Sequence, residues 1–590
     1  MRDGSPAAVT DLRWCLRDLA RTCDPTSPRK RRDVSPAQGV RLAVELESAQ
    51  RRGRVAGVSD GSDRAHVRLA ELVGALSLGI DLGFGQPMEH VLRQCLIALR
   101  LAEHHGLDEQ RRSAVYYTAL LINVGCHSDA HEQAKWFGDD IALKCDKYAY
   151  EFGSLRAAVA GVRRVGSGRP PLHRFRVGLE FALSGHREVD GMIAHHAALA
   201  RSLAEQLQMP DEVLEALGAA YEQWDGKGWP GELKADQVPY MARIAQLAEF
   251  SEVAYRVGGV AAVQELARRR AGKQFDPALA ATMASDAEAI VAGLDTVATW
   301  GEVIEAEPAL AVVLSGERFD LALAAIANFV DLKSPYTLGH ARAVADLAAA
   351  AAVELGTPHP EARTLYRAGL VHGLGRLGVS NSIWDKPGPL GPGEWERVRL
   401  HPHLTERMLQ ESASLRSLGA IAVQFRERLD GSGYPRRLSG GAISRPARIL
   451  GAADAYQAMR EPRPHREARS ADDAARELRA DVRAGSYDAD AVEAVLGAAG
   501  HRVARRREGP AGLTQREVEV LRLLARGLPN KSIAQQLVIS PKTVANHVEH
   551  IYTKIDVSNR AGAGLFAMQH GLLPEEHFPA SAHAGSSLTA

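Results

Sequence analysis

Five histidine and aspartate residues in the second half of the 590-residue chain could bind a metal ion. Each lies in a helical, largely apolar stretch, as expected when several helices project ligands into one bundle core. Imidazoles and carboxylates suit divalent first-row metals, and a bound ion lowers the pKa of a water molecule, so such a set could support phosphoester hydrolysis. For any single histidine, the commoner alternative is a hydrogen-bonded core or surface residue. The candidates are Asp331, His340, His372, His401 and Asp454.

An internal repeat covers most of these positions. Similar residues recur after 250 positions in its early part and after 205 in its later part, and the strings DGKGWP and DGSGYP recur at the second offset. The difference between the offsets predicts an insertion in the first copy, between about residues 126 and 194. The repeat strengthens the case for His340 and His401 but not for His372, whose partner is Ile122. The repeated pairs are Asp81 and Asp331, His90 and His340, His196 and His401, and Glu249 and Asp454.

Length and periodicity predict an all-α protein of several domains. A chain of 590 residues is too long for one hydrophobic core. Apolar residues recur at helical spacing through most of the chain, whereas strand-like alternation is nearly absent. We expect two tandem helical bundles followed by a C-terminal four-helix domain. The expected ranges are a basic, partly ordered leader (1–65), the bundles (66–295 and 296–500), a basic linker (501–510), the C-terminal domain (511–575) and a disordered tail (576–590).

The composition limits where the protein is expected to be found and which partners it is expected to bind. The chain has 72 Lys and Arg against 72 Asp and Glu, so any surface that binds nucleic acid must be local. No uncharged apolar run reaches the roughly 18 residues that a membrane span needs. The first residues contain no apolar signal core, and five cysteines without a CxxC pair do not form a disulfide framework. We therefore expect a soluble cytoplasmic protein with no membrane partner.

Five segments of the second bundle resemble successive motifs of the HD-GYP branch of the HD phosphohydrolase superfamily. They are KSPYTLGH, LVHGLGRLGV, IWDKPGPLGPGEWERVRLHPHLTERML, RERLDGSGYP and ARILGAADAYQAM. The resemblance covers about 310 to 500 with high specificity and about 70 to 290 with lower specificity. It implies helical domains that bind two or three metal ions, often iron or manganese. In active members it also implies hydrolysis of the bacterial second messenger cyclic di-GMP.

The resemblance fails at the positions that would bridge two metals. The paired His-Asp of the family reads His372-Gly373 here, so the bridging carboxylate is missing. The paired histidines before the Glu-Arg-x-Asp-Gly segment read Phe425-Arg426, and the first copy lacks both pairs. We therefore expect two degenerate copies. The second could retain one divalent ion, manganese or iron, whose ligands would be His340, His372 and Asp454, supported by Asp331 or His401.

Arg426 has two interpretations. Together with Arg428 it could bind a phosphate through bidentate hydrogen bonds, so that a hydrolytic pocket becomes one that holds a nucleotide without cutting it. Alternatively, Arg426 forms a salt bridge with a nearby acid. The sequence leaves both interpretations open.

The C-terminal segment contains explicit helix-start signals. Thr514 and Glu517 form a capping box, and Ser540 followed by Pro541 starts a longer helix with one apolar stripe. The spacing is typical of a helix-turn-helix unit whose longer helix fits the DNA major groove. EVEVLRLLARGLPNKSIAQQLVISPKTVANHVEHIYTKI resembles the LuxR-type DNA-binding domain over about 511–575. The implied DNA-binding residues are Lys531, Lys542 and Lys554 for phosphates, and Thr543, Asn546, His547 and His550 near bases or backbone.

Together these features indicate a bacterial transcription regulator that binds promoter DNA, as a homodimer, through its LuxR-type domain. The HD-GYP-like region is expected to sense a nucleotide ligand or to dimerise, without catalysis. One alternative is a metal-dependent phosphodiesterase of the cyclic di-GMP type that carries a DNA-binding domain. In another, the helical repeats form a purely structural dimerisation body.

Overall fold

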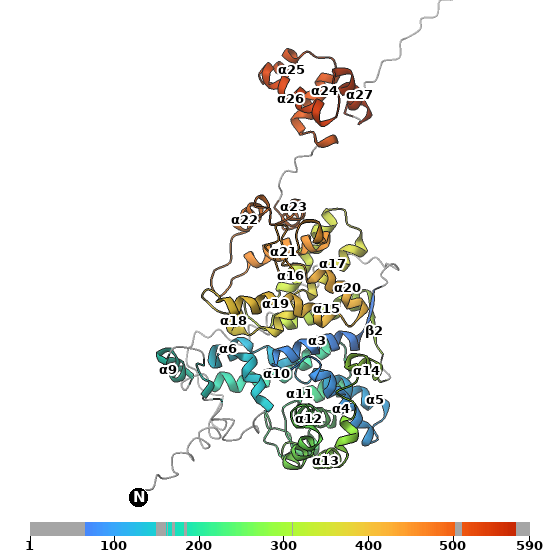
Figure 1. Cartoon of the computed structure of the whole chain (residues 1–590), viewed down its shortest axis with the longest axis vertical. Helices are drawn as coiled ribbons and strands as arrows, with labels where there is room; N and C mark the ends of the chain where they lie inside the picture. The colour runs from blue at the N-terminus through green and yellow to red at the C-terminus, as the bar shows by residue number, and fades with distance from the viewer. Residues whose placement is uncertain are drawn as a thin grey trace, which may run out of the picture. The chain divides into compact units, whose positions relative to one another are not determined.

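The computed structural model describes residues 65–573, with gaps at 149–160, 162, 168–170, 182–185, 309–310, 502–509 and 571. Within these ranges the chain is almost entirely helical, which confirms the all-α prediction (Figure 1). The expected leader, linker and tail lie outside the described residues, apart from positions 65, 501 and 510.

The first copy is built from helices that follow a short strand. Its longest helix, α12, is interrupted at Gly258 and Gly259, where the backbone leaves helical geometry. The elements are β1 (His66–Arg68), α3 (Leu69–Gly83), α4 (His90–His104), α5 (Glu109–Leu121), η2 (Val124–His127), α6 (Ala130–Phe137), α7 (Asp140–Cys145), η3 (Asp146–Tyr148), α9 (Pro171–Glu180), α10 (His186–Gln206), α11 (Asp211–Gly218), η5 (Ala235–Gln237), α12 (Tyr240–Arg270), α13 (Pro277–Val291) and α14 (Thr299–Glu305).

The second copy repeats this order. Helices α3, α4, α5 and η2 correspond to α15, α16, α17 and η6, and α10, α11, η5 and α12 correspond to α19, α20, η7 and α21. Helices α6, α7 and α9 lie in the range where the insertion was predicted. The elements are β2 (Val313–Ser315), α15 (Gly316–Asp331), α16 (His340–Glu354), α17 (His359–Val371), η6 (Leu374–Gly378), α18 (Asn381–Trp384), α19 (Pro392–Leu409), α20 (Ala413–Ala422), η7 (Gly440–Ala442), α21 (Arg445–Arg460), α22 (Ala471–Arg483) and α23 (Ala489–Ala498).

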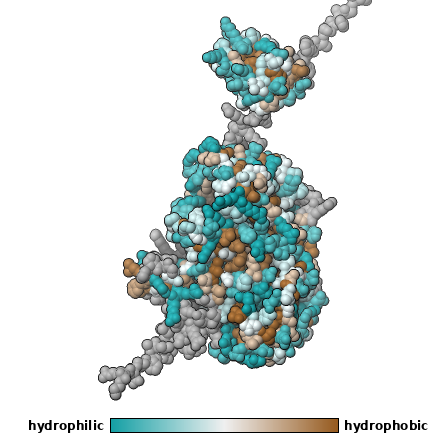
Figure 2. Space-filling model, viewed as in Figure 1, coloured by the Kyte–Doolittle hydropathy of each residue, from teal (hydrophilic) through white to brown (hydrophobic). Residues whose placement is uncertain are grey.

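The two copies share a hydrophobic core. Strands β1 and β2 pair antiparallel, with Val67 opposite Leu314, directly before the first helix of each copy. Helix α3 approaches the second copy so closely that a Cβ atom on Gly79 would lie 2.4 Å from Cε of Met408. One continuous cluster of buried side chains runs from the first copy into α15, α17 and α20. Figure 2 shows the surface as mainly hydrophilic, with separate hydrophobic patches.

The C-terminal domain has a core of its own. The predicted capping box is present, because the Thr514 hydroxyl accepts from the Glu517 amide while the Glu517 carboxylate accepts from the Thr514 amide. Ser540 caps the longer helix as predicted, and Val544 and Ile551 are buried on its inner face. The elements are η8 (Pro510–Gly512), α24 (Gln515–Ala525), α25 (Asn530–Leu537), α26 (Pro541–Lys554) and α27 (Arg560–Gln569).

Among the described residues, no helix combines the length and the apolar character that a membrane span requires.

Candidate functional site

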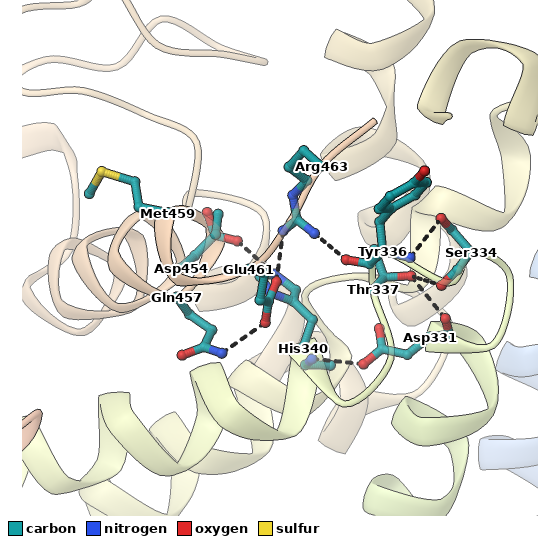
Figure 3. A network of polar contacts seen from close by, with 12 residues as sticks. Asp331, Ser334, Tyr336, Thr337, His340, Asp454, Gln457, Met459, Glu461 and Arg463 are labelled. Carbon is teal, nitrogen blue, oxygen red and sulfur yellow. Dashed lines mark hydrogen bonds and ion pairs between the residues drawn. The ribbon is translucent and has the colours of Figure 1, made fainter. Parts of the chain in front are cut away.

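Three of the five predicted ligands converge in the second copy. His340 at the start of α16, His372 at the end of α17 and Asp454 in α21 each offer one donor atom, and these atoms lie within 4.8 Å of one another. Nε2 of His340 is 3.2 Å and Nε2 of His372 is 3.6 Å from Oδ1 of Asp454. All three side chains are fully buried. Figure 3 shows Asp454 and Glu461 beside His340.

The outer ring nitrogens of the histidines hold them in orientations suited to a metal. Nδ1 of His340 contacts the Glu461 carboxylate at 2.8 Å, and Nδ1 of His372 lies 2.5 Å from the backbone oxygen of Gly369. A carbonyl oxygen can only accept, so Nδ1 of His372 carries the proton. Burial lowers the pKa of His372, so its ring is neutral and its Nε2 keeps a lone pair. Metal-binding histidines usually hold their other nitrogen in this way.

The other two predicted ligands, Asp331 and His401, are also buried but make contacts of their own. Asp331 accepts a hydrogen bond at 2.8 Å from the Ala341 amide at the start of α16, and burial raises the pKa of Asp331 to about 6. Nδ1 of His401 lies 2.5 Å from the backbone oxygen of Val398. Burial, with Arg426 and Arg376 nearby, lowers the pKa of His401 well below its usual value. Neither residue joins the three converging donors.

The guanidinium of Arg426, a permanent cation, contacts the carboxylate of Asp454. Nη1 of Arg426 lies 3.2 Å from Oδ2 of Asp454, so the salt-bridge interpretation of Arg426 matches the observed contact. Burial alone would raise the pKa of Asp454, but Arg426 and the two histidines hold it well below its usual value. Gly373 contributes no donor, and a Cβ atom there would lie 3.9 Å from the Arg376 guanidinium. The residues present therefore fit one divalent ion rather than a bridged pair.

Arg428 is engaged elsewhere. Its guanidinium stacks on Tyr487 at 4.3 Å from the ring centre and donates at 2.8 Å to its neighbour's carbonyl, that of Glu427. The predicted phosphate contact by Arg428 would require these interactions to break.

A cavity of about 550 Å³ lies beside the converging ligands. This volume is within the usual range for a small-molecule site, about 300 to 1,000 Å³. The lining is rich in cations and aromatic rings, with Asp385 as its one acidic side chain among the described residues. Four of the cations are paired with protein carboxylates, so the aromatic rings suit a ligand with flat rings, and the remaining cations suit an anionic group on it. The cationic and aromatic lining residues are Lys333, Arg376, Lys386, Arg426, Arg463, His465, Arg466, Tyr336, Trp384, Trp395 and Tyr434.

Sequence reasoning missed most of this cavity. Tyr434 belongs to DGSGYP, which the sequence identified only as a string shared by the two copies. Arg376 lies in a matched segment, LVHGLGRLGV, but its sequence context assigns it no role, and it is almost fully buried. Arg463 follows α21, where the repeat gives no guidance. It donates to Glu461 at 2.8 Å and to the backbone oxygen of Tyr336 (Figure 3).

The corresponding place in the first copy is organised around a lysine. The ammonium of Lys147 lies 2.7 Å from the Glu249 carboxylate and 3.0 Å from Oδ1 of Asn123. Tyr148 donates to Glu249 at 2.9 Å, and His90 pairs with Glu252. Burial alone would raise the pKa of Glu249, but Lys147 holds it below its usual value. The described part of the first copy brings no comparable set of three donors together.

In the C-terminal domain, the predicted DNA-binding residues are mostly accessible. Helix α26 and the start of α25 expose every one of them except His547, which is half-buried. Lys554 differs from the rest, because its ammonium lies 2.8 Å from the Glu517 carboxylate and donates to the backbone oxygen of Gly512 at 3.1 Å. Its predicted phosphate contact would compete with this ion pair.

Comparison with known proteins agrees with this geometry. Residues 186–279 and 324–491 match the HD domain family, and residues 511–567 match the bacterial regulatory proteins of the luxR family. A 3'3'-cGAMP-specific phosphodiesterase of Vibrio cholerae is 31% identical over 411 residues, which cover 69% of this chain and 89% of that protein. A cyclic di-GMP phosphodiesterase of Pseudomonas aeruginosa is 36% identical over 157 residues, covering 26% of this chain and 38% of that protein.

The architecture is also found in a solved structure. The crystal structure of a cyclic GMP-AMP specific phosphodiesterase of V. cholerae superposes with a TM-score of 0.52 and 26% identity, covering 74% of this chain and 99% of that one. HD domains bind divalent metals, which agrees with the three converging donors. The chain therefore belongs to the HD domain family, among relatives that are cyclic dinucleotide phosphodiesterases of the HD-GYP type, and carries a C-terminal domain of the luxR family.

Proposed function

We propose that this protein is a cytoplasmic, homodimeric transcription regulator whose second HD copy binds a cyclic dinucleotide without hydrolysing it. The observation that carries the proposal is the ion pair between Arg426 and Asp454. In a low-dielectric site, a fixed cation on the central carboxylate opposes binding of divalent ions. Gly373 leaves no carboxylate to bridge two ions, so a two-metal mechanism lacks its ligands.

The cavity supplies groups for binding rather than for bond cleavage. Arg376 lines the cavity, and its buried Nη1 has no hydrogen-bond partner among the described residues, so a shift of this side chain would let it donate to a phosphate oxygen. The indole ring of Trp384 and the phenol of Tyr434 could stack on flat bases. An ion held by His340, His372 and Asp454 would supply Lewis acidity when bound.

Regulation would follow from occupancy of this cavity. A ligand that binds one arrangement of the helical body more tightly shifts the protein towards that arrangement. The luxR-family domains of a dimer would then meet DNA with altered affinity. No bond in the ligand needs to break for this response.

A second candidate function is phosphodiesterase activity through a single ion. It is favoured by the convergence of His340, His372 and Asp454, and by relatives that are cyclic dinucleotide phosphodiesterases.

DNA binding by the full-length protein tests the proposal. Promoter fragments are titrated with and without cyclic di-GMP or 3'3'-cGAMP, and we expect a shift in affinity of about tenfold, within the usual range for coupled sites. Arg426→Lys, which keeps the charge but loses the planar fork, should weaken the response. The matched control is Arg399→Lys, because Arg399 lies on the exposed surface and pairs with Glu396. An identical DNA affinity with and without both ligands would contradict a sensory role.

A further inference from the structure

A buried carboxylate from the first copy contacts the second copy. Asp140 at the start of α7 is fully buried. Its Oδ2 lies 3.3 Å from the ammonium of Lys333 and 3.4 Å from that of Lys144. Its Oδ1 accepts from the Ser380 hydroxyl at 2.7 Å and from the Asn381 amide at 2.8 Å. One side chain of the insertion therefore contacts two separate segments of the second copy.

A second polar contact joins the same parts. Nδ1 of His131 in α6 lies 2.8 Å from Oδ2 of Asp385, and α6 packs against α18, as Figure 1 also shows. Asp385 in turn accepts from Ser334 at 2.6 Å and from the Asn381 side chain at 2.7 Å. Asn381 also donates to the backbone oxygen of Lys333 at 2.6 Å. This network cross-links the two segments of the second copy to each other and to the insertion.

These two segments form part of the cavity wall. Lys333, Ser334, Tyr336 and Thr337 line the cavity from the loop between α15 and α16. Residues 383–390 line it from α18 and the loop that follows. The Thr337 hydroxyl donates to backbone oxygens within its own loop, whereas the contact with Asp140 comes from outside that loop. Helices α6 and α7 therefore support the cavity from behind.

The buried charge of Lys333 depends on the carboxylate of Asp140. Only 3% of the Lys333 side chain is exposed, so water cannot solvate its ammonium group, and Asp140 supplies the neighbouring negative charge. Burial alone would raise the pKa of Asp140, but Lys333 and Lys144 hold it below its usual range. Loss of the carboxylate would leave two ammonium groups close together in a buried space. Burial already lowers the pKa of Lys333, so without Asp140 this side chain would either lose its proton or be hydrated by movement of its loop, and both change the wall of the cavity.

We propose that Asp140 is a positioning residue for the ligand cavity, through which the insertion of the first copy controls the shape and affinity of the site in the second. The ligand part of this proposal rests on the proposed function of the cavity. The positioning part concerns only the protein and can be measured without ligand.

Hydrogen exchange of the full-length protein tests the positioning. In Asp140→Asn, exchange in residues 332–339 and 381–386 should rise about tenfold, as expected for local opening. In α22, α23 and α24–α27 it should stay as in the wild type. Lys144→Met is the matched control, because it removes a partner of the same carboxylate that does not line the cavity, and exchange in both segments should stay within about twofold. In Asp140→Asn with both Lys144→Met and Lys333→Met neither buried ammonium remains, so exchange should return towards the wild-type rate.

Affinity for cyclic di-GMP is measured on the same variants, and Asp140→Asn should weaken it about tenfold while Lys144→Met leaves it unchanged. Unchanged exchange in both segments of Asp140→Asn, or faster exchange throughout the second copy, would overturn the proposal. If the wild type binds no cyclic dinucleotide, the proposed function fails. The exchange measurement still decides whether Asp140 positions the wall.

Discussion

Each HD copy has a buried carboxylate at the corresponding position, and the two copies neutralise it in different ways. In the first copy, Lys147 from the insertion lies 2.7 Å from Glu249, and tyrosine and asparagine side chains complete its surroundings. In the second copy, Arg426 lies 3.2 Å from Asp454, while His340 and His372 still direct nitrogens at that carboxylate. Among the described residues, the first copy thus pairs its carboxylate with an internal lysine, whereas the second keeps three converging donors beside a cavity.

The largest expected difference between the copies is in stability. Lys147→Met leaves Glu249 charged and buried, and loss of one partner of a buried pair should lower the free energy of unfolding by about 3 kcal/mol. Arg426→Met should lower it by only about 2 kcal/mol, because His340 and His372 still direct ring nitrogens at Asp454. Denaturant unfolding measures both variants.

Lys227→Met is the control for these variants. Lys227 forms an exposed ion pair with Asp225, and its loss should change stability by less than about 1 kcal/mol. A larger loss for Arg426→Met than for Lys147→Met would contradict the distinction between the two copies.

The second largest expected difference between the copies is in their affinity for metal ions. Arg426→Met removes a cation from Asp454, so its affinity for Mn²⁺ should rise about tenfold above the wild type. Replacing His340 with Ala in the same variant should abolish that gain. Lys147→Met should acquire no ion, because the described first copy lacks three converging donors. Mn²⁺ titration followed by electron paramagnetic resonance measures all three, and an ion gained by Lys147→Met would remove the contrast.

The pH dependence of stability should reveal what the copies share. Burial raises the pKa of Asp81 to about 7 and that of Asp331 to about 6, and each carboxylate accepts from the backbone amide at the start of a matching helix. Because each folded-state pKa lies above the unfolded value of about 3.9, this stability is fully present below about pH 4 and is lost as pH rises from there to the folded-state pKa, about 6 for Asp331 and about 7 for Asp81.

Asp81→Asn should therefore flatten the decline in stability between pH 5 and 8 by about 1 kcal/mol, and Asp331→Asn by less. Thermal unfolding over this pH range measures the effect. Asp236→Asn, at a position 89% exposed, should leave the profile as in the wild type. An unchanged profile for Asp81→Asn would show that burial of this carboxyl does not control its ionisation.

The C-terminal domain also contains both a lysine that is paired within the protein and a lysine that is free to contact DNA. The expected effect of replacing them is the smallest of those predicted here. Lys542 is exposed near the start of α26, so Lys542→Ala should reduce the salt dependence of DNA binding by about one ion. Lys554 is paired with Glu517, so Lys554→Ala should change that slope less and instead lower the stability of the domain. Fluorescence anisotropy at several salt concentrations measures the slopes. Equal slopes for the two variants would show that Lys554 leaves its partner to contact phosphate.

The sequence predicted what depends on local pattern and on the repeat. Helix caps at Thr514 and Ser540 follow from spacing over a few residues. The repeat favoured His340 and His401, and of these two only His340 joins the converging donors, whereas His372 joins them without a histidine counterpart in the first copy. The sequence could not predict pairs that only packing brings together. Asp140 and Lys333 are separated by 193 positions, and Asp140 lies in an insertion without a counterpart. The pair of Lys147 and Glu249 could not be predicted for the same reason, because Lys147 also lies in the insertion.

The most direct test of the central claim is a single-turnover experiment, with full-length protein in excess over cyclic di-GMP or 3'3'-cGAMP in the presence of Mn²⁺. The account predicts that the ligand binds and is recovered intact by chromatography after many minutes. Linear dinucleotide released at an enzymatic rate, and lost in His340→Ala, would show that the second copy is a hydrolase despite Arg426.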